Sequence, residues 1–317
     1  TINSELQSAI QVNHIDKIQI LAMMTRLRQL CCDQRILYKD IIDNSSNNST
    51  VFNAVLQNLV DQKFPVNDDM KEDAATIIKQ IKSAYKSNYG DNYKDSLNQA
   101  LTSAGYKNLS EYRQRMIKQI QYANFLLDYI DDHFDDVFND YYQQCAPKYV
   151  SLIKISVSDT SSPTDDETSK LNEVKELISN TDKSFGDIAQ DYSDDSTSSK
   201  KGSLGIVDSK DTSGIANSYG KDVFNAIEAL SEGQVSDVIT GDNGYYFVKV
   251  TSTDKKTLKK ELKKTDIDSP LLAYDDYLQY VVYNSYKINY KDKDIKKIVQ
   301  EVVNKALEER KTERGEA

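Results

Sequence analysis

The 317-residue chain has no tryptophan, four prolines, three cysteines and two histidines. Two of the cysteines, Cys31 and Cys32, are adjacent, and the third, Cys145, is distant, so the chain lacks a disulfide framework. The adjacent pair could bind a metal together with His14, but this spacing matches no known ligand pattern. We therefore interpret the cysteines as small buried residues and predict neither a metal site nor a cofactor.

Basic residues are also in the minority, with 40 Lys and Arg against 50 Asp and Glu and a net charge of −10. A surface of this sign opposes binding to phosphate backbones, so we expect no nucleic-acid partner. No apolar run approaches the ~18 residues of a membrane span. The first residues lack the basic region and apolar core of a signal peptide, and there is no lipobox, so we expect no anchor in this chain.

What the chain does contain divides it into four segments. Residues 1–50 predict a helical extension followed by a polar linker, "NSSNNST", at 44–50. Residues 51–147 have apolar residues at helical spacing and predict an all-α lobe. Residues 148–252 hold eight of the eleven glycines and two strand-like stretches, "SLIKISV" and "GYYFVKV". Residues 253–317 return to helical patterns, and we expect them to pack on the N-terminal lobe because neither set has a large core alone.

The most polar stretch of the third segment is "DYSDDSTSSKKGSLG" at 191–205. It has no apolar residue between Tyr192 and Leu204, which predicts a surface loop. It ends on two glycines around Leu204, as if the backbone turns beneath a site.

The third segment resembles the parvulin family of peptidyl-prolyl isomerases. The resemblance is carried by "FGDIAQDYSDDSTSSKKGSLGIV", then "FNAIEALSEGQVSDVIT", then "NGYYFVKV". With its helical flanks, about residues 50–305 resemble the PrsA-type foldases. This implies an α+β fold, in which a parvulin-like domain with a small antiparallel sheet is inserted between the two parts of an all-α chaperone-like lobe.

The resemblance also implies a function and a site. It implies an extracytoplasmic, membrane-associated foldase that acts on unfolded or X-Pro-containing client polypeptides, and it leaves the oligomeric state open, with a dimer as one option. Asp195 matches the acidic residue beside the substrate carbonyl, and Leu204 matches the leucine of the glycine turn. Val223 or Phe224 matches the apolar socket for proline, and Thr240 matches a hydroxyl near the site.

Two positions depart from the parvulin pattern. Where the family usually has a histidine on the first strand and another on the last, this chain has Lys154 and Tyr246. Both side chains can form hydrogen bonds, but a histidine pair cannot form. We therefore keep two functions: a foldase with weak prolyl isomerase activity, in which Asp195, Lys154 and Tyr246 are the catalytic residues, and an inactive holdase that uses the domain as a scaffold.

Residues 14–39 resemble something else, a helical stretch of Swi/Snf-type DNA translocases. No ATPase motif accompanies "KIQILAMMTRLRQLCCDQRILY", so ATP hydrolysis is not inferred. The segment is either fused or artefactual sequence, or an amphipathic helix that resembles the translocases by chance.

Overall fold

The computed structural model describes residues 44–241, 243–262 and 268–316, and these residues form two compact units. One unit contains residues 141–262 and includes the sheet. The other contains residues 44–140 and 268–316 and is helical. Helix α7 (Phe134–Cys145) begins in the helical unit and ends in the sheet unit. The predicted extension at 14–39, with its cysteine pair and its resemblance to translocases, lies outside the described residues.

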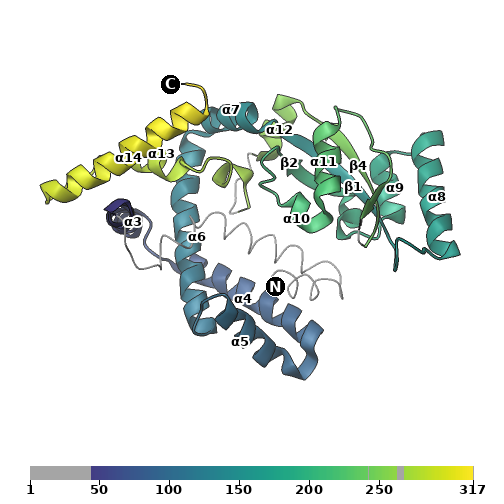
Figure 1. The fold of residues 1–317 in the computed structure, drawn as a ribbon, viewed down its shortest axis with the longest axis horizontal. Coiled ribbons are helices and arrows are strands. Elements are labelled where there is room, and N and C mark those ends of the chain that lie inside the picture. Colours follow the sequence, from purple (N-terminus) through teal and green to yellow (C-terminus); the bar gives the residue numbers. More distant parts are fainter. Residues whose placement is uncertain (1–43, 242, 263–267, 317) are drawn as a thin grey trace. The chain divides into compact units, whose positions relative to one another are not determined.

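The helical unit combines two parts of the chain that are far apart in sequence (Figure 1). The first part contains α3 (Asn44–Lys63), α4 (Asp68–Tyr89), the 3-10 turn η1 (Gly90–Asn92), α5 (Tyr93–Ser103), α6 (Leu109–Asp132) and the start of α7. The second contains η3 (Pro270–Leu272), α13 (Leu278–Ser285) and α14 (Lys293–Glu313). Side chains cap the helix starts: Asn67 accepts a hydrogen bond from the Met70 N–H, and Asn108 accepts one from the Glu111 N–H.

The segment 44–50, expected to be a polar linker, is instead the beginning of α3. Phe52, Leu56 and Val60 of this helix are buried, so packing fixes its central turns. Extending a formed helix adds one hydrogen bond for each residue that is ordered, which polar residues tolerate. The low helix propensity of Asn and Ser favoured a linker, but extension of the packed helix outweighs it.

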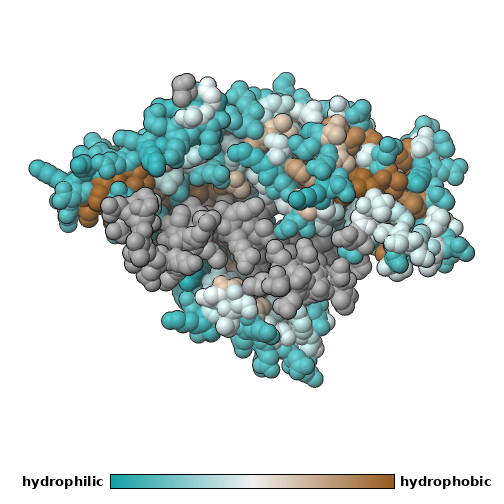
Figure 2. Space-filling model, in the orientation of Figure 1, coloured by the Kyte–Doolittle hydropathy of each residue, from teal (hydrophilic) through white to brown (hydrophobic). Residues whose placement is uncertain are grey.

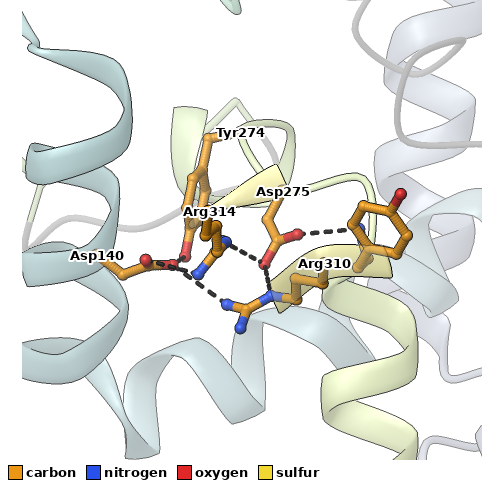
Figure 3. A network of polar contacts seen from close by, with 6 residues as sticks. Asp140, Tyr274, Asp275, Arg310 and Arg314 are labelled. Atoms are coloured by element: carbon orange, nitrogen blue, oxygen red, sulfur yellow. Dashed lines mark hydrogen bonds and ion pairs between the residues drawn. The ribbon is translucent and has the colours of Figure 1, made fainter. Parts of the chain in front are cut away.

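An ion-pair network joins the two parts of the helical unit (Figure 3). Arg314 contacts Asp140 at 2.6 Å and Asp275 at 2.9 Å, and Arg310 contacts the same two carboxylates at 3.3 and 2.8 Å. The Tyr274 hydroxyl donates to Asp140 at 2.7 Å. The side chain of Asp275 is only 2% exposed, so its charge depends on these partners.

The sheet unit contains four antiparallel strands in the order β2-β1-β4-β3. These are β1 (Lys148–Ser156), β2 (Ser203–Val207), β3 (Ile239–Gly241) and β4 (Gly244–Ser252). Its helices are α8 (Asp165–Asn180), α9 (Phe185–Tyr192), η2 (Ser196–Lys200), α10 (Ile215–Tyr219), α11 (Lys221–Ala229) and α12 (Lys255–Leu262). The expected α+β fold with a small antiparallel sheet is confirmed.

Each face of the sheet has its own buried cluster because side chains alternate along the strands. Lys154 lies on the face of the first cluster. This cluster combines strand residues with residues of α10 and α11, and its members are Val150, Leu152, Val207, Ile215, Val223, Ile227, Tyr246 and Val248. The second cluster combines strand residues with residues of α8 and α9, and its members are Ile153, Ile155, Leu171, Val174, Phe185, Ile188, Ala189 and Phe247. Helices therefore cover both faces, and the first cluster underlies the candidate site.

The surface is mainly hydrophilic on the face drawn in Figure 2, with hydrophobic colour gathered in a few patches. Among the described residues, no helix is both long enough and apolar enough to cross a membrane.

Candidate active site

The polar stretch 191–205 is more ordered and less exposed than a surface loop. It includes η2 and the start of β2, and Asp195 is only 6% exposed. The Asp195 carboxylate accepts hydrogen bonds from the Thr197 N–H at 2.9 Å and the Thr197 hydroxyl at 2.7 Å. The predicted surface loop therefore contains a buried carboxylate, which local hydrogen bonds satisfy without solvent.

The glycine turn at the end of this stretch is required by close packing. Gly202 has φ +75°, and a Cβ there would lie 2.4 Å from the Leu152 carbonyl oxygen and 2.8 Å from the Ala189 Cβ. The Gly202 carbonyl accepts a hydrogen bond from the Leu152 N–H at 2.8 Å. Only glycine combines this backbone conformation with so close an approach. The turn thus holds the stretch against β1.

Strand β1 also binds the stretch directly at Lys154. The Lys154 N–H donates to the Ser193 hydroxyl at 3.0 Å, and the Lys154 carbonyl accepts from the Asp194 N–H at 2.8 Å. The Asp194 carboxylate accepts from the Ser156 N–H at 2.9 Å and pairs with Lys170 at 2.6 Å. These bonds fix the backbone on both sides of Lys154 and position Asp195 beside it.

Lys154 and Tyr246 are cross-strand neighbours on one face of the sheet. The Lys154 Nζ lies 5.8 Å from the centroid of the Tyr246 ring, within the range of a cation–π contact. In the described part of the chain, this ammonium has neither a hydrogen bond nor an ion pair. Burial lowers the pKa of Lys154, and the Asp195 and Asp194 carboxylates oppose that change by raising it.

Tyr219, at the end of α10, is a site residue that sequence reasoning missed. Its hydroxyl donates to the Asp195 carboxylate at 3.4 Å, and its ring meets the Tyr246 ring edge-on with 6.2 Å between centroids. Burial and then the Asp195 charge raise the pKa of the Tyr219 hydroxyl, which therefore stays protonated and able to donate. Nothing in the sequence distinguishes Tyr219 from the others among the 21 tyrosines.

The apolar residues predicted for substrate binding differ in accessibility. Leu204 and Phe224 are partly buried and pack against the first cluster, whereas Val223 is buried within it at 1% exposure. Of the two candidates for a proline socket, Phe224 is thus the one whose side chain is partly accessible to a ligand. Leu204 and Phe224 thus pack against the same cluster that contains Tyr246.

Thr240 is not brought together with the other predicted residues. It pairs with Tyr245, whose side chain packs against the second cluster, whereas its neighbour Ile239 pairs with Tyr246. Since paired residues of antiparallel strands point to the same face, the Thr240 side chain lies on the face opposite Lys154. The sequence did not reveal this because it does not give the register of β3.

The arrangement can bind a polar group of a ligand from several sides. It offers a cationic donor at Lys154 and a carboxylate acceptor at Asp195, to which the Tyr219 hydroxyl already donates, next to apolar surface from Leu204 and Phe224. Among the described residues, no three His, Cys, Asp or Glu side chains gather as metal ligands, and the Cys145 side chain is buried.

Comparison with known proteins shows which family the sheet unit resembles. Residues 152–252 match the family described as "Rotamase: PPIC-type PPIASE domain". Over 141 residues, the chain is 32% identical to the foldase protein PrsA of Staphylococcus epidermidis and to that of Staphylococcus aureus. These matches cover 42% of this chain and 41% of the relatives, so the chain spans less than half the length of the curated relatives it matches.

Solved structures with similarity to the chain include PrsA proteins. The foldase protein PrsA from Streptococcus pneumoniae is 19% identical, with a TM-score of 0.39, and the match covers 81% of this chain and 91% of the other. PrsA from Bacillus subtilis is 22% identical, with a TM-score of 0.38, and the match covers 80% and 89% of the two chains.

Proposed function

We propose that this chain, in which residues 152–252 carry a PPIC-type PPIase domain related to that of PrsA foldases, assists the folding of exported polypeptides and isomerises their X-Pro bonds. One observation carries the isomerase proposal: Asp195, Lys154, Tyr219 and Tyr246 lie around one end of the first cluster, next to Leu204 and Phe224. The cellular location that we propose, outside the cytoplasm and near the membrane, follows the resemblance to the foldases.

The reaction requires no covalent intermediate. An X-Pro amide crosses a barrier of ~18–20 kcal/mol because the twisted amide loses its resonance. A catalyst lowers this barrier when it binds the twisted amide better than the planar forms. Leu204 and Phe224 would contact the proline ring, while the polar groups would contact the carbonyl and amide as they rotate.

Each polar group has a distinct part in this proposal. The Lys154 ammonium would donate a hydrogen bond to the substrate carbonyl, and its lack of a hydrogen-bond partner among the described residues leaves it available for this role. Tyr219 and Tyr246 would bound the volume in which the carbonyl turns. Asp195 would hold Tyr219 in place and provide the negative charge that favours the charged form of Lys154.

A second function is favoured by a specific departure from the parvulin pattern. Lys154 and Tyr246 stand where the resemblance leads us to expect two histidines, and the sequence has no histidine between residues 134 and 317. A domain without catalysis would leave a holdase, which opposes aggregation by binding unfolded chains. In that case, the helical unit would bind the client.

Refolding of a client whose slow phase is limited by prolyl isomerisation separates the two functions. An isomerase increases the rate of the slow phase at catalytic concentrations, whereas a holdase raises the yield only near stoichiometric concentrations. We expect the full chain to accelerate the slow phase and Asp195→Ala to lose most of that effect. Acceleration that is equal in Asp195→Ala, or a change in yield alone, would contradict the isomerase proposal.

A further inference from the structure

A pocket of about 580 Å³ lies in the helical unit, between α4, α5 and α6, far in sequence from the candidate active site. Four cationic side chains line it: Lys79, Lys82 and Lys86 from α4, and Arg113 from α6. The three lysines share one face of α4 because they are spaced three and four residues apart. No acidic side chain is among the lining residues.

These charges have no evident structural purpose. None of the four side chains forms an ion pair within the described part of the chain, and Arg113 reaches only the Lys71 carbonyl, at 3.5 Å. Like charges three or four residues apart on a helix repel one another and destabilise it. A cluster of unpaired cations also stands out in a chain whose net charge is −10. Their arrangement around a pocket favours a bound anionic group.

The rest of the pocket is not cationic. Leu109 provides apolar surface next to Ile78, which is itself buried, Tyr93 adds an aromatic ring, and Ser83 and Ser110 add hydroxyls. A ligand that carried only negative charge would make no use of the apolar part. A pocket of this volume suits a few side chains of one ligand, whereas a membrane presents a broad flat surface.

We propose that this pocket binds an acidic, partly apolar segment of a client polypeptide. Carboxylates of the segment contact Lys79, Lys82, Lys86 and Arg113, and a neighbouring apolar side chain packs on Leu109 and Tyr93. Arg113 can bind a carboxylate through two parallel hydrogen bonds. This inference rests on the proposed function, in that it assumes polypeptide clients, but it does not depend on catalysis in the sheet unit.

Peptide binding to the full chain tests the proposal by fluorescence anisotropy. The probe is a labelled, proline-free peptide that alternates Asp or Glu with Leu, and its matched control has Asn or Gln in place of the acids. We expect the acidic peptide to bind at least about tenfold more tightly than the neutral one, and more weakly as salt is raised. The double variant Lys82→Glu with Arg113→Glu should lose at least about tenfold in affinity for the acidic peptide.

A matched control reverses two exposed lysines elsewhere in the helical unit. Lys291→Glu with Lys296→Glu changes the net charge by the same amount and should alter the affinity less than about twofold. If the first double variant fails to fold, as judged by circular dichroism, Lys82→Gln with Lys86→Gln replaces it and should still weaken binding. Equal affinity for the two peptides, or equal losses in the two double variants, would overturn the proposal.

Two further measurements distinguish this inference from its alternatives. Phosphatidylglycerol vesicles that bind the chain more tightly than the acidic peptide, and lose binding in Lys82→Glu with Arg113→Glu, would overturn the assignment to a polypeptide. Prolyl isomerisation should be unchanged in that variant. Isomerase activity without peptide binding would contradict this inference and leave the proposed function standing. Peptide binding without isomerase activity would support this inference and contradict the catalytic part of the proposed function.

Discussion

In our proposal, Lys154 is the residue on which the chemistry of the candidate site depends most. It stands on β1, where a histidine was expected from the resemblance, and its ammonium lies over the Tyr246 ring with Asp195 nearby. A histidine pair could exchange a proton, but prolyl isomerisation needs only binding of the twisted amide. The Lys154 ammonium can supply a donor for that purpose, so the reaction that we propose does not require the histidine pair.

Gly202 provides a prediction at the scale of one residue. Its φ is positive, and a Cβ at this position would lie 2.4 Å from the Leu152 carbonyl oxygen, which leaves no room for a side chain. We expect Gly202→Ala to lower the free energy of unfolding by about 3 kcal/mol or more, since backbone strain and a clash with the backbone add. Urea denaturation followed by circular dichroism measures the change.

Gly205→Ala is the control for that prediction. Gly205 also has a positive φ, +79°, but a Cβ there would meet nothing within 4 Å. The expected loss is therefore that of the backbone conformation alone, about 1–2 kcal/mol. Equal losses at the two glycines would show that the close contact with β1 is unimportant.

At the scale of elements, the stretch 191–205 shows where sequence reasoning succeeded and where it did not. Its glycines and Leu204 predicted a turn beside a site, and the turn is there because Gly202 packs against β1. The burial of Asp195 could not be predicted, because it depends on a local hydrogen bond to Thr197 that polar composition does not reveal. Tyr219 joins Asp195 only through the packing of α10, and the face of Thr240 depends on strand register.

Helix α8 provides a prediction about pH. It begins with a capping box in which Thr164 and Glu167 exchange hydrogen bonds, and Glu167 also accepts from the Ser158 N–H and hydroxyl. The hydrogen bond from the Thr164 N–H, followed by that from the Ser158 N–H, lowers the pKa of Glu167 to about 2. Because this pKa is below its ordinary value of 4.5, the carboxylate stabilises the fold above pH 4.5, and that contribution is lost as pH falls toward about 2.

The measurement is unfolding by urea across that pH range. The difference in unfolding free energy between the original chain and Glu167→Gln should shrink as pH falls from 4.5 to about 2. Thr164→Ala should cost about 1 kcal/mol at neutral pH because it removes the other half of the box. A difference for Glu167→Gln that is constant with pH would contradict the capping role of the carboxylate.

At the scale of the whole molecule, the helical unit depends on residues from before and after the sheet in the sequence. Arg310 of α14 and Arg314, which directly follows this helix, contact Asp140 of α7 and Asp275, which precedes α13 (Figure 3). Sequence patterns predicted that the helices before and after the sheet pack together, but no pattern pointed to these ion pairs. They are set by the three-dimensional arrangement of α7, α13 and α14, which sequence spacing does not give.

Asp275→Ala tests how far this network holds the unit together. The substitution leaves two arginines without their buried partner, so we expect a loss of about 3–5 kcal/mol in unfolding free energy. Asp276→Ala, at the exposed neighbouring position, should change it by less than about 0.5 kcal/mol. Thermal and urea denaturation of both variants measure the difference. Similar small effects at the two positions would mean that packing alone holds α14.

The face of the sheet that bears Lys154, together with Asp195 from the stretch 191–205, is in our proposal a prolyl isomerase site. The cis–trans exchange rate of a short X-Pro peptide, measured by NMR exchange spectroscopy with the full chain at catalytic concentration, tests this proposal without a client protein. We predict faster exchange with the original chain and a rate near the uncatalysed one with folded Asp195→Ala. An uncatalysed rate with the original, folded chain would contradict the proposal.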